Sequence, residues 1–221
     1  MQKILGKSAQ MRPIELLQLT QGSKAILLIG GVHGDEVEGF YLMERFVKEG
    51  AWKEFEGRCA LYVIPRANPD GCALNTRTNA NGVDLNRNMP TRDWTAEVAK
   101  PRYNPGPSAG SEIETKILMD CIDELKPHAI VSAHSWNPMI NYNGPAKDLA
   151  EVMAKHNKYI ITDNIGYPTP GSMGTWSGWE RKIPTITLEI EADLELEKVW
   201  EVHNKALFEG IAFAASHEKL G

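Results

Sequence analysis

A histidine and a glutamate stand three residues apart directly after an apolar run. Residues 30–36 read GGVHGDE, so His33 and Glu36 follow two glycines. Three residues is just under one helical turn, and both side chains can therefore converge at the start of a helix. Such a pair is half of a zinc site that keeps one position open for water. A polar turn whose acid favours a helix N-terminus is the alternative.

A second histidine and a further acid end two other apolar runs. His134 follows residues 129–133, which places it at the same sheet edge as His33 if both runs are parallel strands. Residues 185–188 lead into Glu189 and Glu191, which share one face of a strand. A carboxylate in a buried run is costly unless it is paired or functional. A water-activating zinc hydrolase needs two histidines, one glutamate ligand and one free glutamate. Taken alone, His134 is equally consistent with a buried histidine that is only hydrogen-bonded.

Arginines gather in a long polar segment, residues 67–107. This segment is rich in Asn, Gly, Pro and Arg, and it contains Arg77, Asn86 and Arg87 after the turn NPDG. A loop of this length inside a compact domain is typically functional or disordered. Guanidinium groups suit carboxylates and developing oxyanions, so we expect a substrate with a free carboxylate. Arg92 and Arg102 are expected to be solvated loop residues.

Strands that alternate with helices must position these groups. The apolar, β-branched runs predict strands over residues 25–29, 60–64, 129–133 and 185–190. Helical periodicity predicts helices over residues 36–48, 112–125, 146–158 and 194–216, with Ser111 and Glu114 as a capping box. The pattern predicts an α/β fold, a three-layer α/β/α sandwich around a mixed, mostly parallel sheet. The remaining histidines are expected at the surface: His128, His156, His203 and His217.

Composition narrows the class of protein. The chain has 221 residues, 42% hydrophobic, and a formal net charge of −5, which argues against nucleic-acid and anionic-membrane binding. We expect one catalytic domain over residues 1–221. Three scattered cysteines without a CxxC pair favour neither a disulfide framework nor a cysteine zinc site. The N-terminal residues lack a signal-peptide pattern, so the expected location is the cytoplasm. The oligomeric state is left open, a homodimer included.

Together these segments resemble the zinc carboxypeptidase family of the carboxypeptidase A type. The matching segments are GVHGDE, IPRANPDG, GVDLNRNMP, VSAHSW and TITLEIE, in the family's order. The resemblance implies one Zn²⁺ ion per chain and hydrolysis of a peptide bond. It further implies a small peptide substrate with a free C-terminal carboxylate. It extends over residues 30–191, most of the chain.

The resemblance also assigns roles by position. His33, Glu36 and His134 resemble the zinc ligands, and Glu189 resembles the general acid/base. Arg77 resembles the arginine that polarises the scissile carbonyl. Asn86 and Arg87 resemble the pair that binds the terminal carboxylate of the substrate. Asp84 resembles the acid that orients the first histidine, and Tyr167 resembles the mobile tyrosine that caps the substrate.

One bacterial branch of the family is most similar. The segments NPDGC, RTNANGVDLNRN and GYPTPGSMGTW resemble members that cleave the γ-D-glutamyl–meso-diaminopimelate bond of murein tripeptide in cell-wall recycling. The sequence His134-Ser135-Trp136 is closer to ordinary carboxypeptidases, which keeps a general carboxypeptidase as an alternative. The side-chain pocket is expected to involve Ser172, Met173 and Gly174, with Arg181 as a second carboxylate contact.

Two further alternatives belong to other classes. Deacylases of the aspartoacylase and succinylglutamate desuccinylase type also carry HxxE and a later histidine. A zinc-binding but inactive peptide-binding module is the third reading. Assays with diaminopimelate peptides, N-acetylaspartate and succinylglutamate separate these classes.

Overall fold

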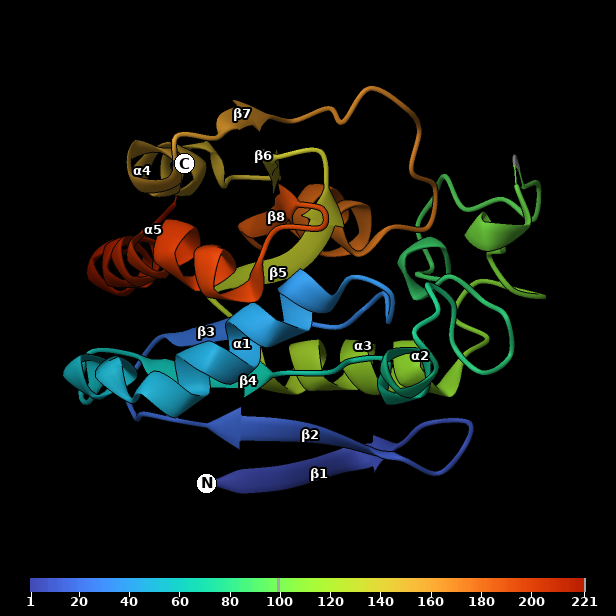
Figure 1. Cartoon of the computed structure of the whole chain (residues 1–221), viewed down its shortest axis with the longest axis horizontal. Coiled ribbons are helices and arrows are strands. Elements are labelled where there is room, and N and C mark those ends of the chain that lie inside the picture. The colour runs from blue at the N-terminus through green and yellow to red at the C-terminus, as the bar shows by residue number, and fades with distance from the viewer. Residues whose placement is uncertain (99, 221) are drawn as a thin grey trace.

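A single eight-stranded sheet forms the centre of the computed structural model, which describes residues 1–98 and 100–220. The strand order is β1-β2-β4-β3-β5-β8-β6-β7 (Figure 1). The strands span Gln2–Lys7 (β1), Pro13–Gln18 (β2), Ala25–Ile29 (β3), Ala60–Ile64 (β4), Ala129–Trp136 (β5), Met139–Asn143 (β6), Ile160–Thr162 (β7) and Thr185–Glu191 (β8). Strands β4, β3, β5 and β8 are parallel, whereas β2 and β6 pair antiparallel with β4 and β8. The predicted mixed sheet is confirmed.

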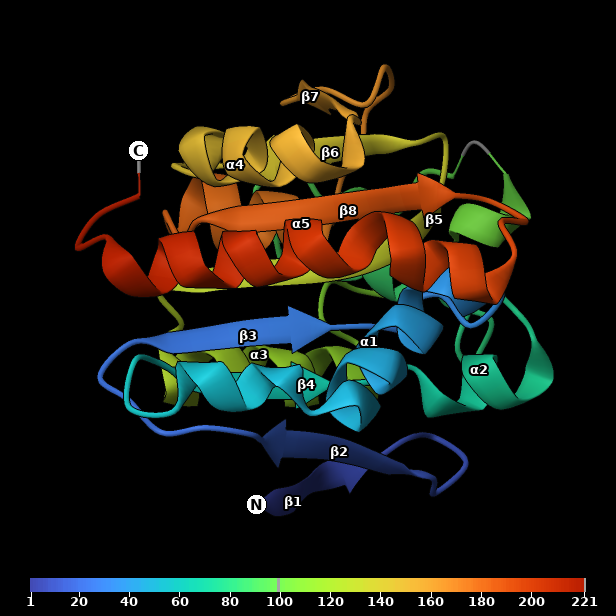
Figure 2. The same cartoon turned by 60° about the vertical axis from the view of Figure 1, so that its left-hand side comes forward.

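Helices cover both faces of the sheet, as the predicted three layers require. Figure 2 shows α5 in front of the sheet and α3 behind it. The helices span Val37–Glu49 (α1), Pro69–Leu74 (α2), Ile113–Leu125 (α3), Lys147–Asn157 (α4) and Leu196–Ser216 (α5). Short 3₁₀ turns occupy Ala51–Phe55, Leu85–Arg87 and Pro101–Tyr103, and a π-helix, η4, spans Gly174–Glu180.

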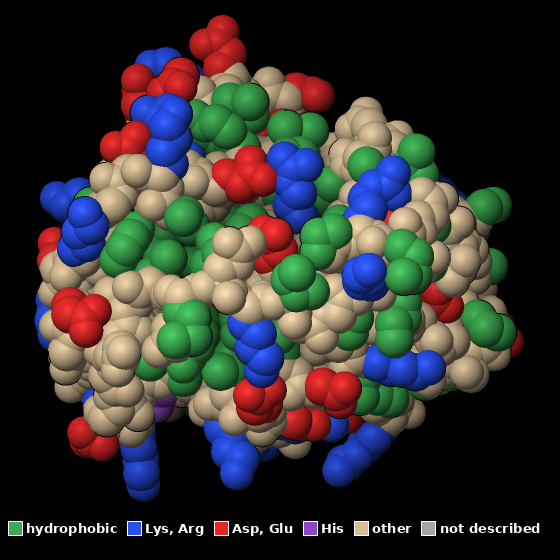
Figure 3. All heavy atoms as spheres, turned by 90° about the horizontal axis from the view of Figure 1, so that it is seen from below, with side chains coloured by type: hydrophobic (Ala, Val, Ile, Leu, Met, Phe, Trp, Pro, Cys, Tyr) green, Lys and Arg blue, Asp and Glu red, His purple; other side chains and the backbone are tan. Residues whose placement is uncertain are grey.

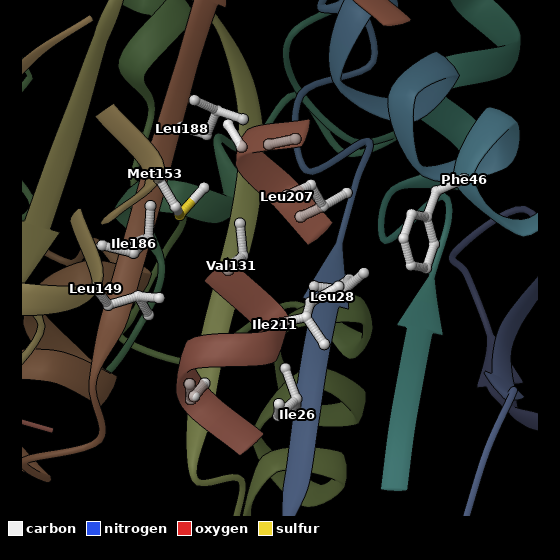
Figure 4. Close-up of a cluster of buried hydrophobic side chains, with 14 of the residues drawn as sticks. Ile26, Leu28, Phe46, Val131, Leu149, Met153, Ile186, Leu188, Leu207 and Ile211 are labelled. Carbon is white, nitrogen blue, oxygen red and sulfur yellow. The ribbon is translucent and has the colours of Figure 1, made fainter. Parts of the chain in front are cut away.

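Alternation along the central strands produces two hydrophobic cores. In β3, Ile26 and Leu28 face the core beneath α1, α4 and α5, and Leu27 and Ile29 face the core beneath α3. This period of two is the geometry of a strand buried on both sides. Figure 4 shows the first core, in which side chains from the sheet and three helices meet: Ile26, Leu28, Phe46, Val131, Leu149, Met153, Ile186, Leu188, Leu207 and Ile211.

Two sequence predictions about helix surroundings are wrong. Ser111 and Glu114 do not form a capping box, because the N-cap residue of α3 is Glu112, which makes no side-chain capping bond. Ser111 donates to the Glu112 carboxylate, and Glu114 accepts from Asn79 and the backbone of Ala9. His203 on α5 is fully buried rather than at the surface. Its ring packs edge to face on Tyr159, with the ring centroids 5.0 Å apart.

The face of the molecule seen from below Figure 1 is mixed in charge. Viewed from below Figure 1, Lys and Arg side chains alternate with Asp and Glu side chains around hydrophobic ones (Figure 3). Among residues 1–98 and 100–220, no helix combines the length and the apolar character needed to cross a bilayer.

Candidate metal centre and substrate cleft

Three predicted ligands converge at one edge of the sheet. His33 lies in the loop after β3, Glu36 is the N-cap residue of α1, and His134 lies in β5, which pairs parallel with β3. The two oxygens of the Glu36 carboxylate lie 2.8 Å from Nδ1 of His33 and 2.9 Å from Nδ1 of His134. One ligand atom from each residue lies within 4.8 Å of the others.

The outer ring nitrogens of both histidines are already bonded. Nε2 of His33 lies 3.0 Å from Oδ1 of Asp84, and Nε2 of His134 lies 3.0 Å from the Ser132 hydroxyl. A carboxylate only accepts, so Nε2 of His33 carries the proton and donates. Metal-bound imidazoles are usually held in this way through the nitrogen opposite the metal. The donor set of two imidazoles and one carboxylate therefore fits zinc.

Interlocked backbones hold the His33 loop in place. The Gly34 backbone lies so close to Gly71 that a Cβ on Gly34 would stand 1.9 Å from the Gly71 carbonyl carbon. The side chain of Asn68 caps α2 by accepting from the Gly71 amide, and it also donates to the Val32 carbonyl at 3.3 Å. The NPDG segment thus forms the first turn of α2 and fastens the loop that carries His33.

Glu189 is buried at the same edge. It is 9% exposed and pairs in register with His134, whereas Glu191, two residues along β8, is exposed. Burial raises the pKa of Glu189 to about 7, with His134 opposing the shift and Glu36 adding to it. A carboxyl group with a pKa near neutrality can both take up and release a proton at physiological pH.

Arg77 and Asp84 form a charged support around the three ligands. Nε of Arg77 donates to Asp84 at 2.9 Å, and Nη1 donates to Glu36 at 3.1 Å. Burial alone would raise the pKa of Asp84, but the His33 ring and the Arg77 guanidinium hold that pKa well below its usual range. Arg77 also lines the cleft that opens beside the ligands.

Asn86 and Arg87 lie in the 3₁₀ turn after Asp84 and line the same cleft. Arg87 is only 6% exposed, and among the described residues it is paired with no carboxylate; its Nη1 donates to the Asn86 carbonyl at 2.7 Å. The Asn86 side chain accepts from the Met173 amide at 2.8 Å. A buried guanidinium without an acid partner is a site for an anionic group of a ligand.

Aromatic residues form the rim of the cleft. The ring of Tyr167 packs edge to face on Trp136, with the centroids 5.5 Å apart, and Tyr167 remains 39% exposed. The ring of Tyr103 lies among three guanidinium groups, those of Arg77 at 5.2 Å, Arg87 at 5.5 Å and Arg102 at 5.7 Å.

The structure corrects part of the predicted pocket. Ser172 and Gly174 line the cleft as expected, but Met173 is buried in a hydrophobic core. Arg181 lies over the Trp176 ring, 3.5 Å from its centroid, and is not among the cleft residues. Arg102 is exposed, as expected, but it also lines the cleft and approaches Asp35 at 3.6 Å.

Sequence reasoning missed several other cleft residues, namely Tyr103, Asn141, Asn143 and Thr187. Tyr103 lies in a 3₁₀ turn of the long polar segment, and Thr187 lies within TITLEIE but was not singled out. Asn141 and Asn143 lie on β6, where no motif surrounds them. Only the unusual density of Asn in residues 137–143 could have drawn attention to this segment.

Comparison with known proteins decides the family. The zinc carboxypeptidase profile matches residues 1–158, more than half of the chain. The chain belongs to the zinc carboxypeptidase family. It is therefore a peptide hydrolase by family, and the α/β/α architecture agrees.

The zinc carboxypeptidase relatives include bacterial murein peptide amidases. Murein peptide amidase A of Vibrio campbellii is 35% identical over 87% of this chain and 82% of its own length. The Escherichia coli K12 protein of the same name is 33% identical over 78% of this chain and 74% of its own length. The solved murein-tripeptide amidase MpaA of Escherichia coli O157 superposes with a TM-score of 0.79 at 27% identity, covering 99% of this chain and 93% of MpaA.

A eukaryotic member has the same fold. Carboxypeptidase A of Helicoverpa armigera superposes with a TM-score of 0.81 at 19% identity, covering 99% of this chain and 69% of the insect chain. At that identity the comparison shows only that the two chains share a fold.

Proposed function

We propose that this chain is a zinc-dependent amidase that removes diaminopimelate from murein tripeptide by cleaving the γ-D-glutamyl–meso-diaminopimelate bond. The observation that carries the hydrolase part is the convergence of His33, Glu36 and His134 beside the buried Glu189. The substrate part is supported by the similarity to murein peptide amidases over most of both chains.

His33, Glu36 and His134 would hold one zinc ion per chain. When bound by such ligands, zinc supplies Lewis acidity that activates water near neutral pH and polarises a carbonyl group. Asp84 keeps the proton of His33 on Nε2, which leaves Nδ1 free to act as a ligand.

The remaining residues divide the work of hydrolysis. Glu189 takes a proton from the attacking water and passes it to the leaving amine. Arg77 donates to the oxygen on which negative charge develops. Arg87 and Asn86 bind the terminal carboxylate of the substrate, and Tyr167 covers the bound peptide from the rim.

Product analysis tests this proposal. L-Ala-γ-D-Glu-meso-diaminopimelate is incubated with the zinc-loaded protein, and mass spectrometry should find L-Ala-D-Glu and free diaminopimelate. An ordinary L-peptide, N-acetylaspartate and succinylglutamate are assayed beside it. Cleavage of the ordinary peptide alone would make the chain a general carboxypeptidase, and cleavage of an acylamino acid alone would make it a deacylase. Zinc binding without cleavage of any compound would support an inactive module.

A further inference from the structure

The cleft does not end at Glu189 but continues into a second hollow. Both hollows share Asn141, Asn143, Ile165, Tyr167 and Thr169. A substrate residue whose α-carboxylate reaches Arg87 can therefore extend its side chain past Asn143 toward Asp163. The shared wall is made of amide and hydroxyl groups as well as apolar ones.

A chain of hydrogen bonds sets the orientation of the Asn143 amide. Strand β6 pairs with β7, and Asn141 donates through Nδ2 to the Thr162 carbonyl at 3.0 Å. A carbonyl oxygen only accepts, so the side-chain oxygen of Asn141 must point away from Thr162. That oxygen accepts from Nδ2 of Asn143 at 3.0 Å. The Oδ1 atom of Asn143 is therefore left as an acceptor, and no described residue donates to it.

The Asn143 amide has little freedom to change this arrangement. Asn143 is only 6% exposed, and its amide lies close to the Gly174 backbone. A Cβ on Gly174 would stand 2.7 Å from Cγ of Asn143. Oδ1 of Asn143 is not among the described side-chain atoms that are buried without a partner, so it is accessible from the cleft and free to accept from a ligand donor.

The charge of the second hollow favours a positively charged donor. Asp163 is the one charged residue among the described residues that line it, and neither Lys nor Arg contributes. The anion-binding arginines, Arg77 and Arg87, lie in the first hollow. The first hollow thus favours anionic groups of a ligand, and the second favours cationic ones.

We propose that Asn143, oriented by Asn141, determines specificity by accepting a hydrogen bond from an ammonium group at the end of the released residue's side chain. This inference rests on the proposed amidase function and identifies how that site selects its substrate. Diaminopimelate and lysine share this ammonium group, and norleucine has the same unbranched chain as lysine without it.

Three tripeptides with L-Ala-γ-D-Glu at the amino end test the proposal. Their third residues are meso-diaminopimelate, L-lysine and L-norleucine, and kcat/KM is measured for each with the wild-type enzyme. We expect at least about tenfold preference for the lysine peptide over the norleucine peptide, the size of a hydrogen bond to a charged group. The order of the diaminopimelate and lysine peptides then identifies which source of the ammonium the enzyme prefers, and either order supports the inference.

Two variants change the Asn143 amide in different ways. Asn143→Leu keeps the side-chain volume but removes the acceptor, and Gly174→Ala pushes the amide out of position. Each should lower the lysine-to-norleucine ratio by about tenfold, because only the lysine peptide offers an ammonium donor to the Asn143 amide. General damage to the fold would lower both peptides together, so the ratio separates recognition from structure.

The outcomes that contradict the inference are distinct from failure of the proposed function. Equal cleavage of all three peptides by the wild-type enzyme would overturn the role of Asn143 and leave the amidase function standing. An unchanged lysine-to-norleucine ratio in both variants would do the same. If the zinc-loaded wild-type enzyme cleaved none of the three, the proposed function and this inference would both be overturned.

Discussion

The Nδ1 atoms of His33 and His134 lie 3.1 Å apart, and both face the carboxylate of Glu36. The rings meet at an interplanar angle of 64°, with their centroids 4.8 Å apart. Two imidazole lone pairs at this distance repel each other unless a proton or a cation lies between them. The two Nδ1 atoms are thus placed to bind one shared cation. The hydrogen bonds from Nε2 of His33 to Asp84 and between Nε2 of His134 and Ser132 fix the orientation of the two rings.

These two hydrogen bonds predict that loss of Asp84 lowers zinc affinity more than loss of Ser132 does. Asp84→Asn replaces the carboxylate behind His33, and we expect zinc affinity to fall by about 10- to 100-fold. Ser132→Ala removes the neutral partner of His134 and should cost less. Competition with a chromophoric chelator measures both affinities without reference to activity. An affinity in Asp84→Asn equal to that of wild type would contradict the proposed role of Asp84.

Glu189→Gln should remove turnover while zinc is retained. The amide keeps the shape of the side chain but cannot accept a proton from water, and loss of a general base typically costs about 10² to 10⁴ in kcat. Glu191→Gln is the matched control, because Glu191 lies on the same strand but is exposed. Product release and bound zinc are measured together. Full activity in Glu189→Gln would rule out the proposed proton transfer.

Arg87→Ala should raise KM far more than it lowers kcat. The buried guanidinium binds the substrate carboxylate before and during the reaction, so its removal weakens binding by about 10- to 100-fold. Arg92→Ala, an exposed arginine of the same loop, serves as the control. Steady-state kinetics with the diaminopimelate tripeptide give KM and kcat separately for both variants. Normal KM with reduced kcat would place Arg87 in the chemical step instead.

His203 predicts a loss of stability in mild acid. Burial lowers the pKa of His203 to about 4, so the unfolded chain takes up a proton below pH about 6.5 while the folded chain stays neutral. The free energy of unfolding therefore falls as the pH drops from about 6.5 to about 4, by an amount on the order of 3 kcal/mol. At higher pH this histidine contributes no pH dependence.

Urea unfolding at a series of pH values checks this prediction. His203→Leu should show a smaller loss of stability between pH about 7 and about 5 than wild type, because the substituted side chain cannot titrate. The difference between the two proteins isolates His203 from the other titrating groups. Parallel curves for the two proteins would show that His203 is accessible to protons in the folded state.

The strands that sequence reasoning missed are the outer two on each side of the sheet, β1 and β2 at one side and β6 and β7 at the other. Strands β3 and β4 were predicted with their observed bounds because each is a continuous apolar run buried on both faces. Strand β1 is mostly exposed and β7 has only three residues, so neither has a distinctive pattern. The π-helix η4 is rich in Gly and Trp, and no simple periodicity predicts it.

The sequence by itself determined the residues that can bind a metal and move a proton. His33, Glu36, His134 and Glu189 each follow or end an apolar run, and runs of parallel strands end at one edge of a sheet. Only the tertiary structure decided which polar groups share the cleft. Asn141 and Asn143 acquire their orientation from the pairing of β6 with β7 and from the approach of Gly174, and Arg181 loses its expected place by stacking on Trp176. Local spacing determines what a strand end presents, whereas the direction of a side-chain amide depends on partners that are distant in the chain.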